Sequence, residues 1–394
     1  MAKTLDNTRE IISQLLSTER DDVLSVYLNV DPTRPENQTS PPSYRIWLKS
    51  ALADLEEKLS QDNGLPREKR LALRELKETV VEYVNNYIPQ GRTLIIFAAP
   101  DFWREFAPMA RIGKNYVHFG KPDVVPFLWL LDEYSPVGIV LVDNFQARFL
   151  SAHLGKASIY EETQLELDIK SWPRYDLRAS TLRGLPLKGS NVDAFADRLA
   201  EKIGSFWREV AEKIEDWVEE EKFSYLLLGG EDKAVSGVKE NLSPRTASRI
   251  VEGFIAPINA SEHEILMRAK PLLTQVERER EERLLQQAIE SALSGGLGAL
   301  GPADVLNTLK EGRAYTLLVS WPVRGEVYWC PQCDFFFTQE TETCSLCRGP
   351  IKKLSLREVI PRLAFEHKAK VEIMAGGPGK RLLEYGGMAA LLRY

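Results

Sequence analysis

The sequence predicts an α/β protein of three domains. Apolar runs of strand length alternate along the chain with segments whose apolar residues recur at the helical period. The length, 394 residues, is enough for two or three domains of about 150 residues each. Residues 294–301 contain four glycines and are expected to form a linker. These observations predict domains at residues 1–133, 134–293 and 302–394.

The first domain is expected to contain a mixed sheet with helices. The apolar run Val23–Val30 predicts a strand, and the Pro- and Asn-rich residues 31–42 predict a loop. Two helices should follow, because Leu48–Leu59 and Leu73–Tyr87 carry apolar stripes. The remaining predicted elements are a strand at Thr93–Ala99, a strand around Val117 and Phe119, and a helix that starts at Phe127–Leu131.

The second domain should open with a hairpin of Gly138–Asp143 and Ala147–Ala152, followed by a strand at Ile159–Leu167. Its clearest helix carries apolar residues at a mean spacing of about 3.6, the helical period: Val192, Phe195, Leu199, Ile203, Phe206, Val210, Ile214 and Trp217. The later elements are expected to be a strand at Tyr225–Leu228, a short helix at Ser243–Ile250, and a helix from the capping box at Ser261 to Leu293, interrupted or kinked at Pro271. The alternating charges of Glu277–Arg283 predict a solvated face on that helix.

The third domain should be a three-layer α/β/α sandwich that carries a cysteine-rich insert at residues 328–352. The predicted elements are helices at Ala303–Lys310 and Leu356–Lys368, strands at Tyr315–Ser320 and Val371–Met374, and a final segment at Gly386–Leu392. We expect the α/β core of this domain not to depend on the insert.

Composition excludes several classes of protein. Apolar residues make up 44% of the chain and charged residues 27%, as in ordinary globular proteins. The formal net charge is −6, so contact with RNA must use local patches. No apolar run approaches the ~18 residues of a membrane span, and residues 1–12 lack the apolar core of a signal peptide. We therefore expect a cytoplasmic protein with no membrane partner.

The four cysteines fall within 18 positions and form two CxxC pairs. Four thiolates at this spacing suit one tetrahedral zinc ion, and a site with four protein ligands has no open position for water. The sequence therefore predicts a structural zinc held by Cys330, Cys333, Cys344 and Cys347. Gly349 should let backbone amides turn towards the sulfurs, whereas Asp334 stands where a glycine is usual. The alternatives are reduced free thiols or a redox CxxC pair.

The sequence offers no catalytic residue. Its four histidines lie in four different segments, without a partner at a catalytic spacing, and Asp132, Glu133 and Asp143 are expected to have turn and surface roles. The long loop 172–191 is more informative, because cations and aromatics together suit phosphates and unstacked bases. Its predicted RNA-binding residues are Trp172, Arg174, Tyr175, Arg178, Arg183 and Lys188. The alternative is a solvated loop whose aromatics pack on their own domain.

The C-terminal residues Leu382–Tyr394 resemble the end of domain three in archaeal and eukaryotic class-one peptide chain release factors and Pelota. Residues Gly301–Ala314 look like the start of the same domain. The resemblance implies a fold similar to a kink-turn RNA-binding ribosomal protein, with a zinc-binding insert that the cysteine pairs match. Ser25–Val30 and Pro136–Leu150 instead look like bacterial homologues of the family, including the ribosome hibernation factor Balon.

The second domain also resembles domain two of this family, at the hairpin Val137–Leu150 and the strand Tyr225–Gly230. In release factors the loop between these elements carries Gly-Gly-Gln, which promotes peptidyl-tRNA hydrolysis. The matching positions here are Lys188, Gly189, Ser190 and Asn191, without the glutamine. Ser190 or Asn191 is expected to cap the helix that follows.

The resemblance implies a ribosome-binding translation factor that enters the aminoacyl-tRNA site and contacts ribosomal RNA and transfer RNA. It also implies an elongation-factor-type GTPase as a partner of domain three. Without the glutamine, the expected role is occupation of the site in hibernation or rescue. Two alternatives are a peptidyl-tRNA hydrolase with an altered loop and a small-RNA-binding adaptor.

Overall fold

The computed structural model describes residues 2–18, 20–61, 66–166 and 191–394. Side chains are described except at residues 2–7, 9 and 191–195. The chain forms two compact units. The central unit comprises Pro136–His153 and Ala157–Leu273, and the terminal unit comprises Lys3–Ser135, Leu154–Lys156 and Thr274–Tyr394. The predicted mixed α/β architecture is confirmed, whereas the three domain boundaries stay a prediction.

The N-terminal part of the terminal unit is a four-stranded sheet of order β3-β2-β1-β4. All of its strand pairs are antiparallel, so the mixed sheet predicted for this part of the chain is wrong. The strands are β1 (Val23–Asn29), β2 (Thr93–Ala99), β3 (Phe102–Phe106) and β4 (Tyr116–Gly120), and η1 (Pro35–Asn37) lies in the loop after β1. Helices α2 (Ser43–Gln61) and α3 (Arg67–Asn86) cover one face, and α1 (Ala2–Ser17) and α4 (Val125–Glu133) cover the other. Every residue of β1 and β2 is buried, which explains their continuous apolar runs.

The C-terminal part of this unit is a sheet of order β10-β16-β11-β15, in which only the β11–β15 pair is parallel. Its strands are β10 (Gly298–Leu300), β11 (Ala314–Ser320), β15 (Lys370–Met374) and β16 (Met388–Leu392). Leu317 packs with α9 (Pro302–Lys310) and α10 (Leu356–Glu366), whereas Leu318 packs with α11 (Gly376–Leu383) and the end of α8 (Glu262–Leu293). Successive strand residues thus face different helices, which produces three layers. The linker interpretation of residues 294–301 is wrong in part, because β10 pairs with β16.

Helix α4 joins the two sheets of the terminal unit into one body. Val125 belongs to the same apolar core as Leu317 and Ile360. The rings of Trp129 and Trp321 stack at 4.7 Å with an interplanar angle of 6°. Such contacts between distant segments are what make the two ends of the chain one compact unit.

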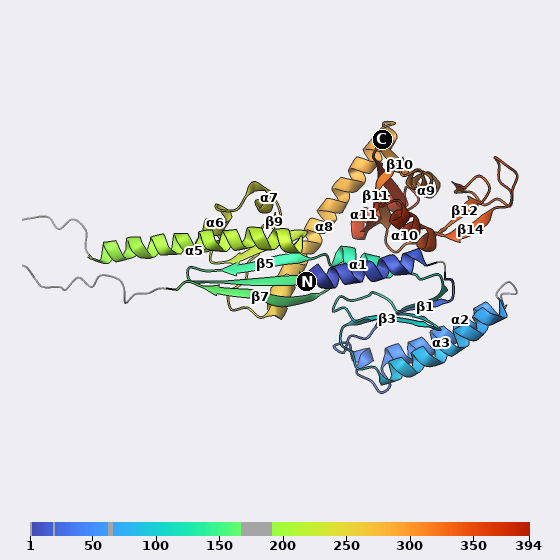
Figure 1. The fold of residues 1–394 in the computed structure, drawn as a ribbon, viewed down its shortest axis with the longest axis horizontal. Coiled ribbons are helices and arrows are strands. Elements are labelled where there is room, and N and C mark those ends of the chain that lie inside the picture. The colour runs from blue at the N-terminus through green and yellow to red at the C-terminus, as the bar shows by residue number, and fades with distance from the viewer. Residues whose placement is uncertain (1, 19, 62–65, 167–190) are drawn as a thin grey trace, which may run out of the picture. The chain divides into compact units, whose positions relative to one another are not determined.

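The central unit is built on a five-stranded sheet of order β7-β6-β5-β8-β9. The strands are β5 (Val137–Val142), β6 (Gln146–His153), β7 (Lys156–Gln164), β8 (Tyr225–Gly230) and β9 (Ile250–Val251). Helix α5 (Asn191–Glu221) runs along this sheet (Figure 1) and buries Phe206, Val210, Ile214 and Trp217 against it. The helical period therefore predicted the buried face correctly from Phe206 to Trp217, whereas Leu199 and Ile203 are half-buried. The side chains of Val192 and Phe195 lie outside the described residues.

The remaining helices of the central unit are α6 (Asp232–Lys239), α7 (Pro244–Ala247) and the start of α8. Ser261 Oγ accepts a hydrogen bond from the Glu264 backbone N–H at 3.2 Å, which confirms the predicted cap. Pro271 lies inside α8 without ending it, so the helix is not interrupted there, and the alternative that it is kinked stays a prediction. Among the residues described, no helix is both long enough and apolar enough to span a membrane.

Candidate metal centre

The four cysteines lie on a small antiparallel sheet of order β13-β12-β14 within the terminal unit. The central strand β12 (Glu326–Cys330) pairs with β13 (Phe335–Phe337) and with β14 (Lys352–Ser355). Cys330 ends β12 and Cys333 lies in the turn before β13, whereas Cys344 and Cys347 precede β14. Pairing of β13 and β14 with one central strand therefore brings the two CxxC turns together.

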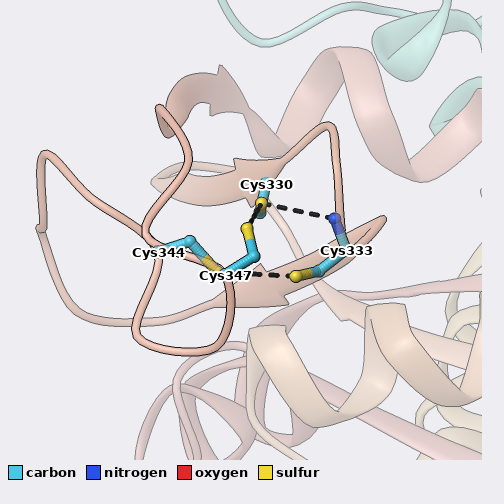
Figure 2. A group of neighbouring side chains, drawn as sticks. All are labelled: Cys330, Cys333, Cys344 and Cys347. Atoms are coloured by element: carbon cyan, nitrogen blue, oxygen red, sulfur yellow. Dashed lines mark hydrogen bonds between the residues drawn. The ribbon is translucent and has the colours of Figure 1, made fainter.

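The four sulfur atoms face one another (Figure 2) at separations that suit a tetrahedral metal ion. The Sγ atoms of Cys330 and Cys347 are 3.5 Å apart, and those of Cys333 and Cys344 are 3.8 Å apart. A tetrahedral zinc ion with Zn–S bonds of about 2.3 Å places its sulfurs about 3.8 Å apart, whereas a disulfide needs about 2.05 Å. The residues present therefore fit zinc, and all four predicted ligands converge on one centre.

Backbone amides support the thiolates that a metal requires. The N–H groups of Cys333, Leu346 and Gly349 each donate to a cysteine Sγ at 3.4 Å. The N–H of Gly349 itself points to Cys347 Sγ, as predicted. A Cβ at this position would meet Gln332 Oε1 at 2.4 Å, so the Gln332 side chain would have to move.

The residue after the second cysteine of each pair has a left-handed backbone: Asp334 has φ 55° and Arg348 has φ 61°. Aspartate is among the non-glycine residues that adopt this region most readily. Asp334 Oδ1 also accepts a hydrogen bond from Trp329 Nε1 at 2.9 Å, and its side chain pairs with Lys310. These contacts explain how aspartate replaces the usual glycine.

The pKa values of Cys333 and Cys344 are shifted in opposite directions. Hydrogen bonding, first to Cys347, raises the pKa of Cys333 to about 12. Burial raises the pKa of Cys344, but hydrogen bonds from the backbone N–H groups of Cys347 and Leu346 outweigh it and lower this pKa to about 7. Cys344 is therefore the thiol that loses its proton most readily of these two. A bound metal cation would favour the thiolate form of the other cysteines as well.

The insert is part of the core of the terminal unit, which corrects the expectation of independence. Val327 and Phe336 are 0% and 4% exposed and pack with Leu306 and Leu317. Asn307 exchanges two hydrogen bonds with the backbone of Phe336, at 3.0 and 2.9 Å. Loss of the insert would therefore expose apolar core.

The residues predicted to bind RNA lie outside the described residues: Trp172, Arg174, Tyr175, Arg178, Arg183 and Lys188. The same holds for Gly189 and Ser190, and Asn191 is the first residue of α5. In the sequence, these residues lie between the end of β7 at Gln164 and the start of α5 at Asn191.

A buried cluster of carboxylates and arginines was not predicted. Carboxylate oxygens of Asp132, Glu277 and Glu372 lie within 4.8 Å of one another, and Arg280 donates to Glu277 at 2.6 Å and to Glu372 at 3.0 Å. Asp132 Oδ2 accepts from the Ile373 backbone N–H at 2.9 Å.

This cluster corrects two expectations from the sequence. Glu277 and Glu281 are 6% and 2% exposed, so Glu277–Arg283 is not a solvated face. Nor do Asp132 and Glu133 have surface roles, since Glu133 pairs with Arg278. Asp143 does have the predicted turn role, because its carboxylate accepts from the N–H groups of Phe145 and Gln146.

The cluster holds protons near neutral pH. Burial, followed by the charge of Glu372, raises the pKa of Asp132 to about 8, and burial raises the pKa of Glu281 to about 7. Burial also acts against ionisation of Glu372, but hydrogen bonding and ion pairing with Arg280 lower its pKa overall. Arg280 therefore neutralises Glu372 while Asp132 stays protonated.

Stability of the terminal unit should fall as pH rises from about 4 to about 8, because the folded state keeps the Asp132 proton that the unfolded state releases. The variant Asp132→Asn cannot ionise and keeps an acceptor for the Ile373 N–H. We expect its melting temperature to fall less than that of the unmodified protein between about pH 6 and about pH 9. Thermal melts at both pH values measure this. The exposed Asp54, replaced by Asn, is the control, and equal pH dependence in both variants would refute the assignment.

The middle of the chain matches the model of a described family. The model of bacterial archaeo-eukaryotic release factor family 10 matches residues 122–272. This range, less than half of the chain, includes α4, the sheet of the central unit and α5. The resemblance to bacterial homologues of class-one release factors, stated from the sequence, is thereby confirmed.

Two curated relatives are archaeal peptide chain release factors. Peptide chain release factor subunit 1 of Archaeoglobus fulgidus is 29% identical over 147 residues, which cover 34% of this chain and 36% of the relative. The protein of the same name from Methanococcus maripaludis strain C7 is 25% identical over 233 residues, 52% of this chain and 54% of the relative. The chain thus spans about half the length, or less, of these relatives. A solved structure of ribosome-bound archaeal Pelota with ABCE1 aligns over 77% of each chain at 14% identity and a TM-score of 0.43.

Proposed function

Because the chain resembles bacterial homologues of the archaeo-eukaryotic release factors, we propose that it is a ribosome-binding translation factor. It occupies the aminoacyl-tRNA site without hydrolysing peptidyl-tRNA, and acts in ribosome hibernation or rescue. The observation that carries this proposal is the family match over residues 122–272, which includes the loop before α5. In this loop Lys188, Gly189, Ser190 and Asn191 stand where release factors have Gly-Gly-Gln.

The absence of glutamine favours occupation over catalysis. Hydrolysis of the peptidyl ester needs a group that positions water at the carbonyl carbon, and the side chains of Ser190 and Asn191 are shorter than glutamine. Asn191 is the first residue of α5, and Ser190 precedes it in the sequence; Ser and Asn side chains commonly cap backbone N–H groups at helix starts.

The loop is suited to RNA contact on a rigid support. Arg174, Arg178, Arg183 and Lys188 give a local positive field on a chain with net charge −6. Helix α5 follows, and its residues from Phe206 onward are buried against the sheet of the central unit. Ribosomal RNA and transfer RNA are the proposed partners of this loop.

The proposed zinc is structural. When bound, it would cross-link the two CxxC turns through Cys330, Cys333, Cys344 and Cys347, and it would leave no coordination position for water. The insert that it stabilises contributes Val327 and Phe336 to the core of the terminal unit. Residues 302–394, which this core supports, are the proposed contact for an elongation-factor-type GTPase.

Cosedimentation tests the proposed function. The full-length chain should sediment with ribosomes, with more chain bound to ribosomes from starved cells than from growing cells. A matched sample without ribosomes controls for aggregation. Recovery of the chain with small RNAs and not with ribosomes would replace this proposal by the adaptor function.

A further inference from the structure

The insert carries an open aromatic face. In the register of its sheet, Tyr328 lies opposite Phe337 and Lys353, and Cys330 lies opposite Phe335. Directly opposed residues share a face, and so do alternate residues of one strand. Tyr328, Phe335 and Phe337 therefore project from the same side of the sheet, and we call these three residues the aromatic face.

The other side of the same sheet is already packed. Val327 and Phe336 are buried in the core of the terminal unit, and Trp329 and Leu354 pack against that core. Phe336 is 4% exposed, whereas its neighbour Phe335 is 38% exposed. Phe335 contacts Phe337 edge-on, with ring centroids 5.1 Å apart. Alternate residues of this phenylalanine run thus point to opposite sides of the sheet. On the side away from the core, Phe335 is exposed, whereas Phe337 is half-buried.

Aromatic rings bind both nucleic acid bases and guanidinium groups, so the surrounding charge decides between them. Residues 326–355 contain three cations and four carboxylates. The cations are Arg348, Lys352 and Lys353, and the carboxylates are Glu326, Asp334, Glu340 and Glu342. Zinc bound by four thiolates would make this segment more negative by two charges.

The cations near the face are also partly neutralised. Lys353 pairs with Glu326 at 2.6 Å, and Lys310 of α9 pairs with Asp334. Glu340 and Glu342, in the loop between β13 and β14, are exposed and are the carboxylates left to a partner. With Lys310 included the side-chain charges balance, so it is the zinc-bound thiolates that would present net negative charge to the phosphates of RNA. An arginine of a partner would stack on a ring and pair with a carboxylate at the same time.

We propose that the aromatic face, with the carboxylates beside it, docks an arginine-bearing basic segment of a partner protein. Each guanidinium lies flat on Phe335 or Phe337 and is flanked by a carboxylate of the insert. Binding of such a partner depends on the aromatic face and the carboxylates of the insert. It does not require that the chain occupy the ribosome.

The test uses the full-length chain and two fluorescent probes, a hexa-arginine peptide with glycine spacers and a hexauridylate. Anisotropy titrations at about 0.15 M salt measure both affinities. We expect the peptide to bind, and we expect Phe335→Ser with Phe337→Ser to weaken its binding about tenfold, since exposed cation–π contacts are each worth about 0.5–1 kcal/mol. The pair Phe335→Tyr with Phe337→Tyr should restore binding.

Phe145→Ser is the matched control, because Phe145 is an exposed aromatic of the central unit, 47% exposed. An unchanged zinc content would show that the insert of each variant is folded. Equal peptide affinity in the double-serine variant and in Phe145→Ser would overturn the proposal. So would undetectable peptide binding, or tighter binding of hexauridylate that is lost in the double-serine variant.

Discussion

Replacing Cys330 by serine should remove zinc from the chain and unfold the insert. Cys330 is completely buried, ends the central strand of the insert and lies 3.5 Å from the sulfur of Cys347. Structural zinc contributes on the order of 10 kcal/mol to folding of small metal-binding modules, so loss of one ligand has a large effect. Metal analysis should give about one zinc per chain for the unmodified protein and almost none for the variant.

The effect should extend beyond the insert, because Val327 and Phe336 belong to the apolar core and Asn307 of α9 bonds to the Phe336 backbone. Hydrogen exchange should therefore increase in the insert and also in α9. Ser345→Ala, an exposed change in the second CxxC turn, is the control and should retain zinc. A folded, metal-free unmodified protein would contradict the assignment.

Replacing both Arg178 and Arg183 by glutamate should weaken ribosome binding by one to two orders of magnitude. If each arginine contacts one phosphate, removing it makes the plot of log affinity against log salt concentration less steep by about one unit. The new glutamates also repel the phosphates of the RNA. Cosedimentation across a salt series measures both the affinity and the slope.

The matched control is Lys202→Glu with Arg208→Glu, two exposed cations of α5 whose reversal changes the net charge equally. This variant should keep most of the affinity. Equal weakening in the two variants would show a general charge effect and would remove the RNA role of the loop.

The sequence predicted two kinds of element well. These are helices whose apolar residues recur at the helical period, and strands in which every residue is buried. The stripe of α5 and the apolar runs of β1, β2 and β5 are such cases. Strand β3 was missed because Arg104 and Glu105 interrupt its apolar residues. Helix α11 was missed because it starts with Gly376-Gly377-Pro378-Gly379, a composition typical of turns.

Helix α11 and the arginine–carboxylate cluster depend on contacts between residues that are far apart in the sequence, which a local pattern does not reveal. Gly379 packs close to Met374, and its carbonyl accepts a hydrogen bond from Ser320 Oγ at 2.8 Å. The arginine–carboxylate cluster has the same origin, since Arg280 and Glu372 are 92 positions apart. The cysteine centre was predictable because spacing alone specifies the chemistry of its two turns.

The central claim, occupation of the ribosome without peptide release, is tested most directly by a release assay. Ribosomes that carry labelled peptidyl-tRNA and an empty aminoacyl-tRNA site are mixed with saturating full-length chain, and bound chain and freed peptide are measured in the same sample. We predict that the chain binds and that freed peptide stays at the level of the buffer control. Rapid release that is lost in the variant Ser190→Ala with Asn191→Ala would contradict this account and would establish a peptidyl-tRNA hydrolase.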